Sequence, residues 1–215
     1  MSGGPHEGGQ VLHDGLPLRE AGAAAILVHG RGATAESILG LTPLVDPGGF
    51  TFLAPQAAGH TWYPESFLQP IERNEPWLSS AIGVLAALLD RIGQEGIPPE
   101  RTMLLGFSQG ACLALEFAAR NARRYGGLVG LSGGLIGPDG TPRDYPGSLG
   151  GTPVFLGCSD VDPHVPKRRV EETADVLRRL GGEVEVRLYP GMGHAISDDE
   201  LAVVRRLFRS VGPAG

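Results

Sequence analysis

Cysteine is scarce in this sequence, and features of secreted and membrane-spanning proteins are missing as well. Two cysteines, Cys112 and Cys158, cannot form a disulfide framework, and no CxxC pair is present to hold zinc. The longest nearly apolar run, residues 81–89, is about half as long as a membrane span requires. The first ten residues lack the positive and apolar regions of a secretory signal. We therefore expect a soluble, cytoplasmic protein without a membrane span.

Basic residues are also fewer than acidic ones. The chain carries 18 Lys and Arg against 24 Asp and Glu, a net charge of −6. A nucleic-acid-binding domain is expected to be strongly basic, so we expect no nucleic-acid partner. A length of 215 residues fits one domain, which we place at residues 1–215, with residues 1–8 flexible.

Short β-rich runs alternate with helical ones, which is typical of an α/β fold. Residues 10–20 are predicted to form a hairpin that turns at Asp14-Gly15. The apolar runs suit a mostly parallel sheet that is covered by helices on both faces. The predicted strands are residues 23–30, 50–54, 103–105, 128–131, 154–156 and 184–188.

Helices are predicted from apolar residues spaced three and four apart, as in residues 78–89 and 170–180. Ser197-x-x-Glu200 is a capping box, which predicts the start of the last helix. Two long turn-rich stretches, residues 56–76 and 133–151, do not fit this alternation. Long loops in compact domains are commonly functional, so we expect both to form walls of a pocket.

A nucleophile elbow, G-x-S-x-G, occurs at residues 106–110 with Ser108 at its centre. The pattern recurs around Ser132, so the match alone is weak. An elbow requires a strand before the serine and a helix after it. Ser108 is followed by good helix formers, whereas glycines and a proline follow Ser132. We therefore predict that Ser108 is the nucleophile and that Ser132 ends a strand beside the site.

A serine nucleophile needs a histidine base and a carboxylate that orients it, in the chain order Ser, Asp, His. Only His164 and His194 follow Ser108. His194 lies in a turn after a predicted strand and is the predicted base, while His164 is interpreted as a solvated loop residue. The acid is Asp160 or Asp162, between which spacing does not decide.

The reaction also needs two N–H groups that stabilise the oxyanion. One is the N–H of Gln109, and the other should come from the loop His29-Gly30-Arg31-Gly32 after the first predicted parallel strand. The side chain of His29 is interpreted as a packed imidazole at a strand end.

These motifs together resemble the carboxylesterase/phospholipase group of α/β-hydrolases, which includes acyl-protein thioesterases. The resemblance extends over nearly the whole chain and rests on residues 29–33, 54–56, 61–64, 106–111, 131–133, 159–166 and 191–194. It implies an α/β-hydrolase fold, Asp162 as the triad acid, and the Arg31 and Gln109 amides as the oxyanion hole. The pair Trp62-Tyr63 resembles the aromatic wall over the acyl site.

The chain departs from this group at Arg31, where the relatives usually carry leucine or a small residue. The guanidinium could bind a substrate carboxylate or simply be a surface charge. The segment between Gln56 and Trp62 is shorter than in the thioesterases, which argues against a long acyl chain. Dienelactone hydrolases carry cysteine at the elbow. This chain has Ser108 there, which argues against a dienelactone hydrolase.

We thus predict a serine carboxylesterase for small ester substrates of short to medium acyl chain, with no cofactor, no metal and no separate cap domain. A thioesterase or lysophospholipase is the alternative, and a silent ligand-binding homologue is a third interpretation. An exposed sheet edge could pair two copies into a homodimer. The predicted acyl-pocket lining is Trp62, Tyr63, Phe107, Leu135 and Met192.

Overall fold

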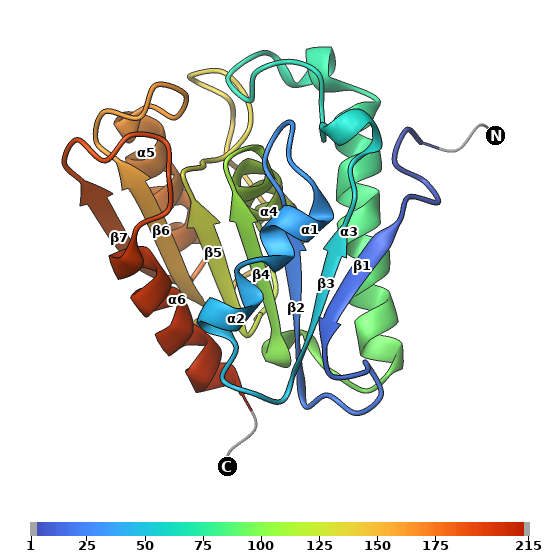
Figure 1. Ribbon diagram of the computed structural model, residues 1–215. Coiled ribbons are helices and arrows are strands. Elements are labelled where there is room, and N and C mark those ends of the chain that lie inside the picture. The colour runs from blue at the N-terminus through green and yellow to red at the C-terminus, as the bar shows by residue number, and fades with distance from the viewer. Residues whose placement is uncertain (1–3, 213–215) are drawn as a thin grey trace.

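The computed structural model describes residues 4–212, which are built around one seven-stranded sheet (Figure 1). All neighbouring strands run parallel except β1 and β3, which pair antiparallel at one edge. In their order across the sheet, the strands are β1 (Val11–Gly15), β3 (Phe50–Pro55), β2 (Ala23–Val28), β4 (Thr102–Phe107), β5 (Gly127–Leu131), β6 (Pro153–Ser159) and β7 (Glu183–Tyr189).

Helices cover both faces of this sheet (Figure 1). One face packs against α3 (Trp77–Gln94), α4 (Gln109–Arg120) and α5 (Lys167–Arg179). The other packs against α1 (Ala35–Leu39), α2 (Thr42–Val45) and α6 (Asp198–Val211). Side chains alternate between the two cores along β2, so every residue of that strand is fully buried. This burial on both faces explains why the parallel strands appear in the sequence as continuous apolar runs.

The predicted parallel strands and longer helices are confirmed. All six strand predictions fall within or overlap β2 to β7, and the capping box of Ser197 and Glu200 opens α6. The predicted hairpin of residues 10–20 is wrong, because β1 pairs with β3 instead of turning back on itself. Gly15 does adopt the positive φ that the motif requires, but the chain continues from it as a loop into β2.

The second long loop, residues 133–151, is held by buried charged side chains. Glu116, from α4, accepts hydrogen bonds from the Ile136 N–H and the Tyr145 hydroxyl. Arg169, from α5, donates to the carbonyl oxygens of Leu135 and Gly137. These contacts give an irregular segment a fixed path over the α4–α5 side of the sheet.

The amino-terminal segment also has specific contacts. His6 is buried, and its ring bonds the Trp62 carbonyl and the Ala58 N–H at 2.9 and 3.1 Å. The prediction that residues 1–8 are flexible falls partly on residues 1–3, which lie outside the described part of the chain. Residues 4–8 form turns that pack against the remainder of the domain.

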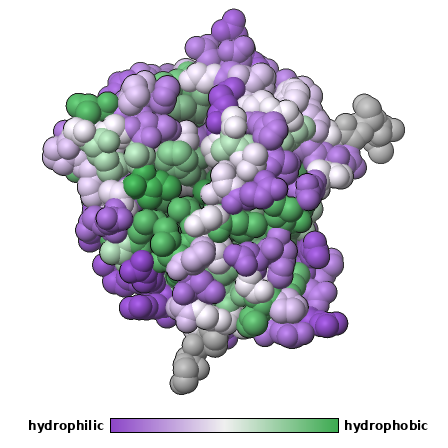
Figure 2. Space-filling model, viewed as in Figure 1, coloured by the Kyte–Doolittle hydropathy of each residue, from purple (hydrophilic) through white to green (hydrophobic). Residues whose placement is uncertain are grey.

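The face with α1, α2 and α6 has apolar residues gathered across its middle and polar residues around them (Figure 2). Partly buried Leu41, Leu201 and Leu207 pack against the core beneath this face. Among residues 4–212, no helix has the length and apolar character needed to cross a membrane.

Candidate active site

Four loops at the carboxyl ends of parallel strands bring the predicted site residues together. Arg31 follows β2, Ser108 follows β4, Asp162 follows β6 and His194 follows β7. Ligands of open α/β sheets bind outside the carboxyl ends of the strands, and this arrangement has that form.

Ser108 lies in a sharp turn between β4 and α4. Its φ of 55° is unusual for a residue with a side chain, and such strain is typical of functional positions. The two glycines of the motif make the turn sterically feasible. A Cβ atom at Gly106 would collide with the Gly110 backbone, and one at Gly110 would collide with the carbonyl groups of Val28 and His29. The motif therefore has glycine at two positions because the end of β4, the start of α4 and the end of β2 are in direct backbone contact.

The side chains of Ser108, His194 and Asp162 form one hydrogen-bonded chain. Ser108 Oγ lies 2.8 Å from His194 Nε2, and His194 Nδ1 lies 2.7 Å from Asp162 Oδ2. Asp162 Oδ1 accepts further hydrogen bonds from the N–H groups of His164 and Val165. The other candidate acid, Asp160, bonds the Gly191 N–H instead.

The environment of Asp162 favours the charged carboxylate. Burial opposes ionisation and is the largest single influence, because the side chain has no exposed surface. The hydrogen bonds from His194 and from the two backbone N–H groups outweigh it together, so the pKa of Asp162 is lowered. Cys158 lies 3.8 Å from the same carboxylate, and burial raises the pKa of its thiol to about 12. Cys158 is thus a neutral neighbour.

The backbone N–H groups of Arg31 and Gln109 have no hydrogen-bond partner within residues 4–212. Gln109 is the first residue of α4, where the helix dipole presents partial positive charge.

His29, by contrast, is fully buried, and its ring accepts a hydrogen bond from the Ala57 N–H, as expected for a packed imidazole.

The side chains of Arg31 and Gln109 both contact residues 61–65, which we call the aromatic loop. The Arg31 guanidinium donates to the carbonyl oxygens of Tyr63, Pro64 and Glu65 at 2.7 to 3.0 Å. The Gln109 carboxamide accepts from the Trp62 N–H and donates to the Tyr63 carbonyl. Neither predicted interpretation of the Arg31 side chain included this contact.

A cavity of about 460 Å³ opens beside Ser108, which is a common size for small-molecule sites. Tyr63 is the one member of the predicted acyl-pocket lining that borders it. The lining consists of Arg31, Tyr63, Pro64, Glu65, Ser66, Phe67, Ser108, Gln109, Cys112, His164, Val165 and His194.

The structure does not bring the other four predicted pocket residues to this cavity. Trp62 and Leu135 are fully buried, and the Trp62 ring packs between His6 and His29. Phe107 packs against the His194 ring, and Met192 does not reach the lining. The loop of residues 133–151 therefore supports α4 and α5 rather than forming a wall.

His164 is an exposed loop residue, as interpreted from the sequence, but it also lies beside the reactive groups. Its exposed ring packs edge-on against His194, with 4.9 Å between centroids, and borders the cavity. Sequence reasoning missed this residue and also Ser66, Phe67 and Val165 as lining residues. Proximity in the sequence to Asp162 was a usable signal for His164 and Val165, but nothing in the sequence indicates which way the side chains of Ser66 and Phe67 point.

The second serine motif has a different environment. Ser132 is fully buried at the end of β5, and turns rather than a helix follow it. Its Oγ has no partner among the described residues, and no base approaches it as His194 approaches Ser108. Ser132 is thus a strand-end residue, as predicted.

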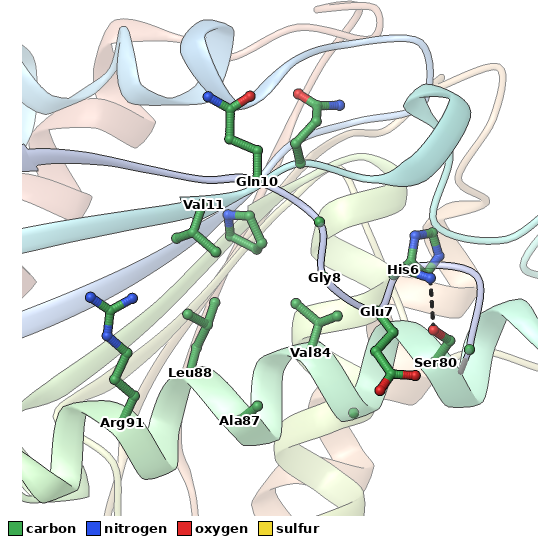
Figure 3. Close-up of a pocket in the computed structure, with 15 residues that line it drawn as sticks. His6, Glu7, Gly8, Gln10, Val11, Ser80, Val84, Ala87, Leu88 and Arg91 are labelled. Atoms are coloured by element: carbon green, nitrogen blue, oxygen red, sulfur yellow. Dashed lines mark hydrogen bonds between the residues drawn. The ribbon is translucent and has the colours of Figure 1, made fainter. Parts of the chain in front are cut away.

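A second cavity, of about 520 Å³, lies between the amino-terminal segment and α3. Figure 3 shows this segment passing over the helix, with the His6 N–H bonded to Ser80 Oγ at 2.9 Å. None of the predicted site residues lines this cavity.

The family model for phospholipase/carboxylesterase matches residues 17–211. The chain belongs to the phospholipase/carboxylesterase family. Its mostly parallel sheet with helices on both faces is accordingly the α/β-hydrolase fold, and no cap domain is evident in the part of the chain that is described.

Two solved structures resemble the chain over nearly its whole length. A phospholipase/carboxylesterase from Dyadobacter fermentans is 39% identical, with a TM-score of 0.91 over 97% of this chain and 99% of that chain. The esterase PE8 is 26% identical, with a TM-score of 0.75 over 94% and 98% of the two chains.

Relatives known from sequence match a shorter region. Acyl-protein thioesterase 1 of Gibberella zeae is 35% identical over 55% of this chain and 51% of its own length. A probable carboxylesterase of Oryza sativa subsp. japonica is 33% identical over 56% and 46%. The alignments thus span about half the length of these curated relatives.

Proposed function

We propose that this protein is a serine esterase that hydrolyses carboxylic esters through an acyl-enzyme intermediate. The hydrogen-bonded chain from Ser108 through His194 to Asp162, open to a cavity, is the observation that carries the proposal. Family membership supports it independently.

In the first half-reaction, Ser108 Oγ attacks the ester carbonyl carbon while His194 Nε2 takes the hydroxyl proton. Asp162 holds the imidazole in the tautomer with hydrogen on Nδ1 and stabilises the imidazolium that forms. The carbonyl oxygen becomes an oxyanion, which the Arg31 and Gln109 N–H groups stabilise. When this intermediate collapses, the bond to the alcohol breaks and His194 returns the proton to the leaving alcohol.

In the second half-reaction, water attacks the acylated Ser108. His194 now takes a proton from the water and then protonates Ser108 Oγ as the carboxylic acid leaves. No metal or organic cofactor enters either half-reaction. Because a protonated imidazole cannot act as the base, activity is expected to fall in acid.

Short to medium acyl chains suit the cavity better than long ones. The aromatic loop forms one wall and is fastened to Arg31 and Gln109, and polar groups of Ser66 and Cys112 border the space. The resulting site is a preformed cleft of limited size rather than a long apolar channel.

The proposal is tested with fluorophosphonate labelling and with p-nitrophenyl esters. Wild type is expected to be labelled and active, whereas Ser108→Ala should lose both properties, because the nucleophile is removed. Ser132→Ala is the matched control, since it alters the other serine motif, and should stay active. An active Ser108→Ala variant would contradict the proposal, and an unlabelled wild type would favour the silent homologue.

A thioesterase is the second candidate, since relatives named acyl-protein thioesterase match the chain. The same nucleophile and oxyanion hole can act on a thioester carbonyl. A panel of oxygen esters and thioesters of matched acyl length separates the two. A higher kcat/KM for short oxygen esters supports the esterase, and a higher value for long-chain thioesters supports the alternative.

A further inference from the structure

The contacts of Arg31 reach farther than its backbone N–H group. Its guanidinium forks onto three successive carbonyl groups of the aromatic loop, and its Cζ lies 6.0 Å from the centre of the Tyr63 ring. Charge-assisted, forked hydrogen bonds of arginine are strong and fix geometry as well as distance. The N–H groups used in this way are not free to bind a substrate carboxylate bidentately.

The aromatic loop is joined to the segment of Arg31 at several further points. Gly32 N–H bonds the carbonyl of His60, the residue directly before this loop, at 2.8 Å, and the Trp62 indole N–H bonds the His29 carbonyl at 2.9 Å. On its other side the loop is bonded to the Gln109 side chain. The loop thus bridges the two residues whose N–H groups are the proposed oxyanion-hole donors.

We propose that the Arg31 side chain is a positioning residue, which orients the oxyanion-hole N–H of its own backbone by tying it to the aromatic loop. The inference rests on the proposed function. Without the fork, the bonds of Gly32 and of the Trp62 indole still join the loop after β2 to the segment of the aromatic loop, but the Arg31 N–H is held less firmly in one direction. Preorganised donors stabilise a transition state because they need not reorganise during the reaction.

The proposal separates the shape of arginine from its charge. Lysine keeps the charge but has one compact ammonium group, which cannot fork onto three carbonyl groups. Methionine removes the charge and keeps much of the length. If the fork is what matters, Arg31→Lys and Arg31→Met should behave alike on an uncharged ester. If the charge recognises substrate, lysine should retain activity and the loss should be confined to anionic esters.

The test measures kcat and KM for p-nitrophenyl butyrate, normalised by active-site titration so that only competent sites are counted. Loss of one oxyanion donor costs about 10²–10³-fold in kcat, and a misdirected donor should cost about tenfold with KM nearly unchanged. The inhibition constant of a trifluoromethyl ketone, which forms a tetrahedral adduct with the serine, should rise by a similar factor. Arg205→Met is the control, because this half-buried arginine of α6 bonds the Leu44 carbonyl in α2, away from the site.

Hydrogen exchange provides a readout that does not depend on turnover. Amide exchange in residues 61–65 should be faster in both Arg31 variants than in wild type and in Arg205→Met. Unchanged kcat and unchanged exchange would overturn the inference, as would a loss confined to anionic esters and rescued by lysine. An inactive wild type would instead count against the proposed function, while the exchange data would still decide whether the fork holds the loop.

Discussion

At the scale of single residues, Asp160 and Asp162 differ in their surroundings although both follow β6. Asp162 is buried against His194 and receives two backbone hydrogen bonds, whereas Asp160 is exposed and bonds the Gly191 N–H. A carboxylate orients an imidazole only through direct contact, so the structure favours Asp162 as the acid.

Asp162→Asn should therefore reduce kcat by about 10³–10⁴-fold, because the amide no longer holds the required tautomer of His194. Asp160→Asn is the matched control and should change kcat far less, since it affects a turn. Steady-state kinetics on a short ester measure both variants. Equal losses in the two would contradict the assignment of the acid.

At the scale of elements, the contact between α4 and the end of β2 depends on Gly110. The carbonyl groups of Val28 and His29 occupy the space that a side chain at Gly110 would need. Gly83, in the exposed part of α3, has no neighbouring atom within 4 Å of the equivalent position.

Gly110→Ala should destabilise the fold by about 3 kcal/mol or more, because the backbone of α4 has to move. Gly83→Ala should stabilise it by about 0.5–1 kcal/mol, because alanine is the better helix former in open space. Denaturant unfolding measures both free energies. A Gly110→Ala variant as stable as wild type would contradict the steric explanation of the motif.

The elements of the sheet could be predicted from the sequence because their signals are local. Apolar runs identified β2 to β7, and the capping box identified the start of α6. The partner of β1 could not be predicted, because pairing with β3 depends on contacts across the sheet and not on the turn at Gly15. The short helices α1 and α2 carry too few residues for a periodic signal.

In the candidate site, too, some features could be predicted from the sequence and others could not. Strand ends and chain order were sufficient to select Ser108 and His194, whose side chains are in contact. Four of the five predicted pocket residues do not border the cavity, because aromatic character does not reveal on which side of a loop a ring lies. Trp62 faces His6 and His29, whereas its neighbour Tyr63 faces the cavity.

At the scale of the whole molecule, His6 connects the first described residues to the aromatic loop. Its Nε2 bonds the Trp62 carbonyl and its Nδ1 accepts from the Ala58 N–H, so the ring fits as the neutral form. Burial lowers the pKa of His6 from its ordinary value of 6.5, although the bond to Trp62 opposes this. Burial lowers the pKa of His29 in the same way.

A lowered histidine pKa makes stability depend on pH. Below about pH 6.5 the unfolded chain takes up protons that the folded chain does not, so the free energy of unfolding should decrease as the pH falls. His6→Gln keeps hydrogen-bonding groups but does not titrate, and should flatten this dependence between about pH 5 and 7. Thermal unfolding at several pH values measures it, with the exposed His13→Gln as control. An equally steep dependence in His6→Gln would contradict the prediction.

The direction of α6 has a practical consequence. This helix begins four residues after His194, and 14 residues later the chain reaches Gly212, which packs near Phe50 and Pro47 at the amino end of β3. The last described residue therefore lies at the end of the sheet opposite to Ser108. A solid support or fluorescent fusion attached beyond Gly212 would leave the entrance for substrate unobstructed.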